Sequence, residues 1–481
     1  MDMSLNRAAK IILGVFSVPF LAWVLASAYF TVVGCDLPEV VDSCESLPEP
    51  QNLSPDENAY TAIREYTDNL PSNSTPFHLN YKLRRAYLDG TTNRLALADS
   101  ATAFITAESN TFAVAERILA ARGIEVPFDE MLSACARFCV LMRIALAYRV
   151  KATREAAQGN LAAGRRSLMD AYKVGRFLQI HDSLSLELSR VIGQSICSIA
   201  LYSAESALFA PDEDEEWRAS LRKLHLALLD GDVELTKTAA RRGYSGCVRA
   251  VVGNYATNTA ARGRLISGGR NLWDVVMEGA VKGGVMDRSN DIEARFLAAL
   301  ATACPGYARY SFQPNRTLSA CRAGLDDFCR RIDVNVYDSK YANESDRIVA
   351  GRFSRNWLAT RIPPVGGMRG AYRSFFRMRL DAYAKTAVLA CRSYKVKYGK
   401  CPEALSALVP EFLPEVPRDP YDGKELRYNA KDCFIWTRGE KLAFDGDVTA
   451  LYENHPYLMS YSDRRCVFFI EEAKCGHSRR K

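Results

Sequence analysis

The pattern of hydrophobic and polar residues divides the chain into segments of very different character. Residues 11–34 form the most uniform segment, with twenty-four consecutive residues that carry no charge. An α-helix rises about 1.5 Å per residue, so this run is long enough to cross a hydrocarbon core of roughly 30 Å. A helix this apolar on all faces predicts a transmembrane anchor rather than a buried core helix.

Residues 35–76 are rich in proline, serine, asparagine and acidic side chains. This composition is typical of a linker, and only residues 57–69 show a pattern that favours a short helix. We therefore expect an acidic tether between the anchor and a folded body.

Residues 77–361 are dominated by apolar residues at three- and four-residue spacing, whereas alternating, strand-like stretches are scarce. This spacing predicts an α-helical body. The predicted helices are 95–121, 128–157, 161–179, 184–209, 217–229, 271–279 and 291–303. The acidic run 212–216 is interpreted as a helix N-terminus, where carboxylates complement the helix dipole.

One turn in this body resembles part of a tetratricopeptide (TPR) unit. Gly159, Asn160 and Leu161 are followed by Gly164, whose small size allows neighbouring helices to approach closely, and by Leu168 and Ala171 on the same face. The pattern does not recur at thirty-four residues, so it predicts an irregular stack of antiparallel helix pairs rather than a regular solenoid. Such TPR-like arrays usually present a surface to a protein partner.

The charges beside the apolar run predict its orientation. Arg7 and Lys10 precede it, whereas the first seven charged residues after it are all acidic. By the positive-inside rule, residues 1–10 form a cytoplasmic tail and the rest of the chain lies outside. The net charge of +7 is modest for 481 residues and indicates no nucleic-acid partner.

The fate of the apolar run has two interpretations. Secretory signals have an apolar region of about 7–15 residues, so the greater length of this run favours a retained signal-anchor. The alternative is a lipoprotein anchored at Cys35, because Val32, Val33, Gly34 and Cys35 resemble a bacterial lipobox. Both interpretations place the body at a membrane surface.

The chain has fourteen cysteines. Because this topology places the body outside the cytosol, several of them are expected to form disulfides. None forms a CxxC pair. The candidate partners by location are Cys391 with Cys401, Cys321 with Cys329, and the group Cys433, Cys466 and Cys475. The connectivity stays open, because one sequence does not determine it.

Residues 352–379 interleave arginines with aromatic residues. This composition is able to bind an anionic envelope polymer or lipid headgroups. The competing interpretation makes residues 363–367 a hinge between domains, with the aromatic side chains in a core and the arginines on the exposed face. We favour the hinge interpretation, because the helix that follows needs a hydrophobic core to pack against and the aromatic side chains supply one.

The C-terminal part has a more specific pattern. A helix over 381–397 stops at Gly399, Pro402 begins a short helix, and a turn at 419–423 leads into strands at 426–429 and 433–437. This succession over residues 380–450 resembles the C-terminal part of type II secretion major pseudopilins. It resembles still more the same segment of uncharacterised bacterial membrane-anchored helical proteins.

The resemblance implies a bacterial inner-membrane protein with its body in the periplasm. Pseudopilins carry a calcium-binding loop after these strands, and its counterpart here keeps Asp445 and Asp447. Two carboxylates are too few for a cation that prefers six or more oxygens, so a plain β-turn is favoured and no metal site is predicted. The N-terminal span also lacks the pseudopilin processing site.

No motif for a nucleophile elbow, zinc protease, phosphate loop or dinucleotide fold is present. The five histidines are scattered singly. We therefore predict no catalytic, cofactor-binding or metal-binding residues.

The predicted fold is mainly α: one transmembrane helix, an irregular helix-pair array over 77–361 and a small α+β domain over 362–481. The predicted function is a non-catalytic membrane-anchored envelope scaffold or binding module. The alternatives are an envelope enzyme acting on a cell-wall or surface polymer and an accessory component of a secretion or pilus-like system.

Overall fold

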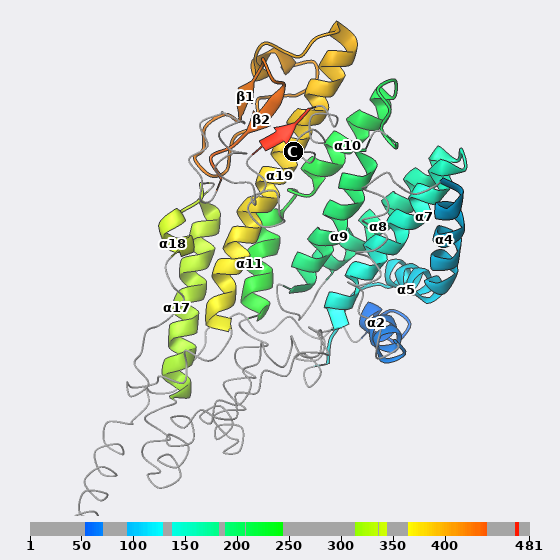
Figure 1. Cartoon of the computed structure of the whole chain (residues 1–481). Coiled ribbons are helices and arrows are strands. Elements are labelled where there is room, and N and C mark those ends of the chain that lie inside the picture. Colours follow the sequence, from blue (N-terminus) through cyan, green and yellow to red (C-terminus); the bar gives the residue numbers. More distant parts are fainter. Residues whose placement is uncertain are drawn as a thin grey trace, which may run out of the picture. The chain divides into compact units, whose positions relative to one another are not determined.

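The computed structural model describes residues 53–70, 94–127, 137–181, 188–206, 208–243, 313–334, 336–343, 364–439 and 467–470 (Figure 1). This described part is mainly helical and has one small antiparallel sheet, as predicted. The predicted anchor at 11–34 and the predicted helices at 271–279 and 291–303 lie outside it. Of the helices in the described ranges, none is both long enough and apolar enough to cross a membrane.

The chain divides into two compact units. One unit consists of Met1–Pro48, Gly243–Asp327 and Ser345–Met368, and the other of Glu49–Arg242, Phe328–Glu344 and Arg369–Lys481. Most of the described residues belong to the second unit. The predicted boundary at 361/362 stays a prediction, because residues 344–363 lie outside the described ranges.

The predicted helices that fall on described residues are confirmed as helical segments. Their bounds are α2 Ala59–Asp68, α4 Arg94–Ala107, α5 Ser109–Ala120, α7 Met142–Ala157, α8 Leu161–Ile180, α9 Leu188–Ala204, α10 Glu215–Ala227 and α11 Asp232–Gly243. Two further helices are α17 Pro314–Asp333 and α18 Ser339–Asn343. The predicted helix over 95–121 is two helices, and the buried carboxylate of Glu108 lies at their junction, bonded to Thr111 and Arg143.

The turn between α7 and α8 follows the predicted pattern. Gly159 has a φ of +84°, which favours glycine, and the side chain of Asn160 accepts a hydrogen bond from the Ala163 N–H at 3.1 Å. A Cβ at Gly164 would lie 2.8 Å from the carbonyl oxygen of Ala152, so only glycine permits this approach of the two helices. Leu168 is fully buried.

Helices α8 and α9 approach each other even more closely. A Cβ at Gly175 would lie 2.5 Å from the carbonyl oxygen of Gly193, which places the two backbones in direct contact. Nearby, the thiol of Cys197 donates a hydrogen bond to the carbonyl oxygen of Tyr172 at 3.4 Å. The helices α7, α8 and α9 therefore form one tightly packed layer of the second unit.

The long helix α19, Pro364–Tyr398, begins earlier than the predicted start at Asp381. Residues 364–367, predicted as part of a hinge, are helical instead. Proline is favoured at the first position of a helix, because its missing N–H would have no partner there and its φ is already helical. At the other end, Gly399 has a φ of +71° and its N–H bonds to the carbonyl oxygen of Lys395, as the predicted stop requires.

The chain beyond α19 folds into a small module, residues 399–439 and 467–470, which we call the cap. It contains a short 3-10 helix, Leu405–Leu408, and the strands β1 Arg427–Asn429, β2 Phe434–Trp436 and β3 Val467–Phe469 (Figure 1). The sheet is antiparallel in the order β1-β2-β3, with Tyr428 opposite Ile435 and Ile435 opposite Phe468. Strands β1 and β2 are confirmed at the predicted places, whereas β3 was not predicted.

The cap packs on the C-terminal half of α19 and shares a hydrophobic core with it. From α19 this core takes Leu380, Ala384, Ala387, Val388, Ala390 and Cys391. From the cap it takes Leu405, Leu408, Leu413, Leu426, Cys433, Ile435, Phe468 and Ile470. The helix therefore forms one wall of the core that holds the three short strands.

Candidate functional site: a buried ionic cluster on the long helix

Buried ionisable side chains are concentrated where the end of α9 and the helix α10 meet α19. Glu205 directly follows α9, His225 lies on α10 and Lys385 on α19. The two Glu205 carboxylate oxygens lie 2.5 Å from His225 Nε2 and 2.6 Å from Lys385 Nζ. Because each oxygen already has a partner on a different helix, the three side chains form a closed cluster.

Burial alone would raise the pKa of the Glu205 carboxyl, but the positive Lys385 and the neighbouring His225 outweigh it and lower the pKa to about 2. The carboxylate is therefore ionised throughout the physiological pH range. A general base works best with a pKa near the operating pH, so a carboxylate with this pKa is a weak base at neutral pH. Its arrangement suits the joining of three helices better than proton transfer.

A second polar group lies about two helical turns further along α19, where α10 also contacts it. The guanidinium groups of Arg218, which is 1% exposed, and Arg222 both donate to Ser393 Oγ, at 3.4 and 2.8 Å. Both arginines also bind Glu215, at 3.1 and 2.9 Å. Arg218 further donates to the carbonyl oxygen of Pro211. These contacts fix α10 against α19.

The start of α10 confirms the interpretation of the acidic run. Asp214 is the N-cap, and its side chain accepts a hydrogen bond from the Trp217 N–H at 2.9 Å. This bond and the ion pair with Arg165 lower the pKa of the Asp214 carboxyl. The acidic residues therefore start a helix, as predicted.

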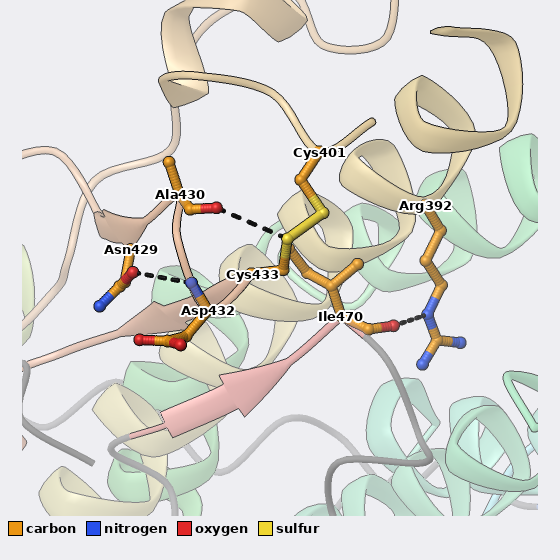
Figure 2. Close-up of a disulfide and its surroundings, with 7 residues drawn as sticks. All are labelled: Arg392, Cys401, Asn429, Ala430, Asp432, Cys433 and Ile470. Atoms are coloured by element: carbon orange, nitrogen blue, oxygen red, sulfur yellow. Dashed lines mark hydrogen bonds between the residues drawn. A yellow bond between two sulfur atoms is a disulfide. The ribbon is translucent and has the colours of Figure 1, made fainter. Parts of the chain in front are cut away.

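Arg392 links the cluster to the cap. Its Nε donates to the carbonyl oxygen of Ile470, just after β3, at 2.7 Å (Figure 2). Its Nη1 donates to the Glu205 carbonyl oxygen at 3.2 Å. A single side chain on α19 therefore bonds to the end of the sheet on one side and to the end of α9 on the other.

The described part of the arginine-rich stretch 352–379 is engaged inside the protein. Tyr372, Phe375 and Phe376 are buried, as the core interpretation predicts. Arg379 binds both carboxylate oxygens of Asp232, at 2.7 and 2.9 Å. The prediction that the arginines lie on an exposed face is therefore wrong for Arg379, because a buried carboxylate on α11 attracts it inward.

Burial opposes the charge of Arg379, but the bonds to Asp232 outweigh it and raise the pKa of the guanidinium. Arg373 likewise donates to the carbonyl oxygen of Ala342. Residues 352–363 of the stretch lie outside the described ranges.

The described cysteines pair differently from the predicted combinations. Cys401 is bonded to Cys433, with a Cα–Cα distance of 6.3 Å and a sequence separation of 32 (Figure 2). Cys391, predicted as the partner of Cys401, is free and buried, because it lies on the face of α19 that enters the core. Cys321 is a free, buried thiol, so the predicted Cys321–Cys329 bond is not formed, whereas Cys466 and Cys475 lie outside the described residues.

Two of the five histidines lie in the described ranges. His225 belongs to the ionic cluster, and His181 ends α8 with its ring stacked on Phe177, where burial lowers the pKa of its imidazole. Glu205 and Lys385 are not among the residues predicted from the sequence. The only signal was a charged residue in an apolar stretch, since Lys385 lies among the alanines of a core-facing helix segment.

The acidic residues of the cap turn are bound by protein groups. Asp419 is fully buried and accepts hydrogen bonds from Arg427, Thr437 and the Tyr421 N–H, and Arg427 also binds Asp422. Among the described residues, no group of three or more histidine, cysteine or acidic side chains is arranged to hold a metal ion. Asp445 and Asp447 lie outside the described residues.

Comparison with known proteins adds no relative to this picture: no protein family matches the chain, and neither does any curated protein or solved structure.

Proposed function

We propose that this protein is a non-catalytic scaffold or binding module of the bacterial cell envelope. Residues 11–34 anchor it in the inner membrane as a single span, and the body lies in the periplasm. The tether predicted over residues 35–76 is shorter in this proposal, because α2 within it has a buried face and belongs to the body. The observation that carries the proposal is the Cys401–Cys433 disulfide, because such bonds persist in oxidising compartments and are rare in the cytosol.

The closed character of the ionic cluster supports a non-catalytic role. His225 and Lys385 both bind Glu205, and the low pKa of the Glu205 carboxyl makes it a weak base. Arg218 and Arg222 are likewise bound to Glu215 and to Ser393. These groups stabilise contacts between helices, which is what a rigid scaffold requires.

The binding surface in this proposal is the helical array, arranged as irregular TPR-like helix pairs. Its exposed apolar residues include Tyr202 on α9, which is 60% exposed, and Leu208 just after that helix, which is 46% exposed. Lys385 Nζ lies 5.1 Å from the centre of the Tyr202 ring, so the ring is held in place although it faces solvent. Exposed, ordered aromatic rings are common anchors of protein partners.

The topology is tested with reporter fusions at Lys481. Alkaline phosphatase is active only outside the cytoplasm, so we expect an active fusion to the full chain and an inactive fusion to a chain that lacks residues 1–34. The variant Cys35→Ala separates the two anchors: a retained span predicts unchanged membrane association, whereas loss of association would establish the lipoprotein. Activity of a cytoplasmic reporter at Lys481 would contradict the proposal.

The binding role is tested by site-specific photo-crosslinking in intact cells. A photo-reactive phenylalanine analogue at Tyr202 is expected to give a discrete protein adduct. Tyr398, at the end of α19 and 46% exposed, is the matched control and is expected to give none. Equal adducts at both positions, or none at Tyr202, would argue against the array as the binding surface. An adduct with known secretion components would favour the secretion-system alternative.

A further inference from the structure

The Cys401–Cys433 disulfide closes a covalent loop, which consists of the part of the cap that precedes β2, the central strand of the sheet. Cys401 lies three residues beyond Tyr398, where α19 ends, and Cys433 directly precedes β2. The segment between them contains the 3-10 helix, the turn around Asp419 and β1. The bond therefore fastens the whole segment to the end of the long helix (Figure 2).

The sheet that depends on this bond is small. Each of its three strands has three residues. Cys433 also extends the pairing of β2 with β3, because its carbonyl oxygen accepts the Ile470 N–H at 3.2 Å. Sheets with few and short strands have little independent stability, and small modules commonly rely on disulfides. The helices α7, α8 and α9, in contrast, have a core of their own that contains no disulfide among the described residues.

We propose that this disulfide is a redox switch for the cap: the oxidised pair holds the cap closed on α19, and reduction opens it while the helical array stays folded. This inference goes beyond the proposed function, because it concerns a conformational change of the cap. It applies whether the body lies in the periplasm or in the cytoplasm.

The reductant is a dithiol. Its thiolate attacks the sulfur of Cys401, which is the more exposed of the two, and Cys433 leaves as a thiolate that takes up a proton. The second thiol of the reductant then resolves the mixed disulfide and releases Cys401 as a thiol. Two electrons and two protons pass to the protein, and the reductant becomes a cyclic disulfide.

Two buried thiols allow the opening to be measured within one molecule. Cys391 lies in the core between α19 and the cap and is fully buried, and this burial raises the pKa of its thiol to about 12. Cys197 is also fully buried, but it lies between α8 and α9. Opening of the cap exposes Cys391 and leaves Cys197 covered.

The experiment uses the full chain, either oxidised or reduced with a dithiol that is then removed. Both samples are treated with N-ethylmaleimide, and the modification of Cys391 and Cys197 is followed by peptide mass spectrometry. The chain entropy of a loop closed over 32 residues predicts that reduction raises the modification rate of Cys391 about 500-fold. The rate for Cys197 is expected to stay unchanged.

The double variant C401S/C433S, without reductant, is the second measurement. It is expected to show the same rapid modification of Cys391 as the reduced wild type. Continued protection of Cys391 in the reduced protein would overturn the proposal. Parallel exposure of Cys391 and Cys197 would also overturn it, because the whole unit would then be loosened and the cap would not act separately.

Discussion

Lys385→Met removes the lysine partner of the buried Glu205 carboxylate and keeps most of the side-chain volume. The pKa of that carboxyl is lowered from 4.5 to about 2 in the folded protein. At 1.36 kcal/mol per pKa unit, this shift corresponds to about 3 kcal/mol of stability. Breaking a buried ion pair on one side costs about 3–5 kcal/mol, because the remaining charge is left without compensation.

His225 still bonds one oxygen of Glu205 in this variant. Because the Lys385 side chain is 25% exposed, water partly solvates the carboxylate and reduces the loss of stability. We therefore expect Lys385→Met to lower the free energy of unfolding by about 2–3 kcal/mol at pH 7. The assay is urea unfolding of the full chain, followed by helical circular dichroism and by tryptophan fluorescence.

Lys400→Met is the matched control. Lys400 also pairs with a glutamate, Glu403, but both side chains are largely exposed. Exposed ion pairs contribute little, so no measurable change is expected. Equal stability of Lys385→Met and wild type at pH 7 would refute the reasoning about the cluster.

The pH dependence gives the sign of the effect. A carboxyl whose pKa is lowered by folding contributes stability that is fully present above its ordinary pKa of 4.5 and is lost as the pH falls towards 2. The difference between wild type and Lys385→Met is therefore expected to be constant above about pH 5 and to shrink below it. A difference that grows in acid would contradict the assignment of the shift to Lys385.

Two further substitutions test the helical array. In thermal melts, Gly175→Ala is expected to destabilise the α8–α9 contact by about 1–3 kcal/mol, because the new Cβ meets the Gly193 carbonyl oxygen. The control Gly324→Ala, where nothing lies within 4 Å of the new Cβ, is expected to be neutral or slightly stabilising. Asp214→Ala is expected to cost about 1 kcal/mol, since it removes the N-cap bond to Trp217; an unchanged melting temperature would contradict the capping role.

Local patterns explain how much of the fold was predictable. The helices of the array follow from apolar periodicity, and the start of α10 follows from its acidic N-cap. The first half of α19 was missed because Pro364 and the glycines after it resemble a break, although proline also suits the first position of a helix. Strand β3 has three residues and acquires its identity only by pairing with β2.

The ionic cluster was not predictable because it depends on contacts between distant residues. Lys385 and Glu205 are 180 positions apart, so no local spacing connects them. The disulfide is similar: Cys391 is nearer in sequence to Cys401, but it lies on the core-facing side of α19, and the turn before β2 places Cys433 beside Cys401 instead.

The most direct test of the account is peptide mass mapping of the protein isolated from native membranes and alkylated without prior reduction. The account predicts an intact chain that retains residues 11–34, a linked pair of peptides that contain Cys401 and Cys433, and a free thiol at Cys391. Complete alkylation of both Cys401 and Cys433 would show that the disulfide is absent in the cell, and would remove the observation on which the proposed topology rests. A chain that begins at a lipid-modified Cys35 would replace the retained span with a lipoprotein anchor.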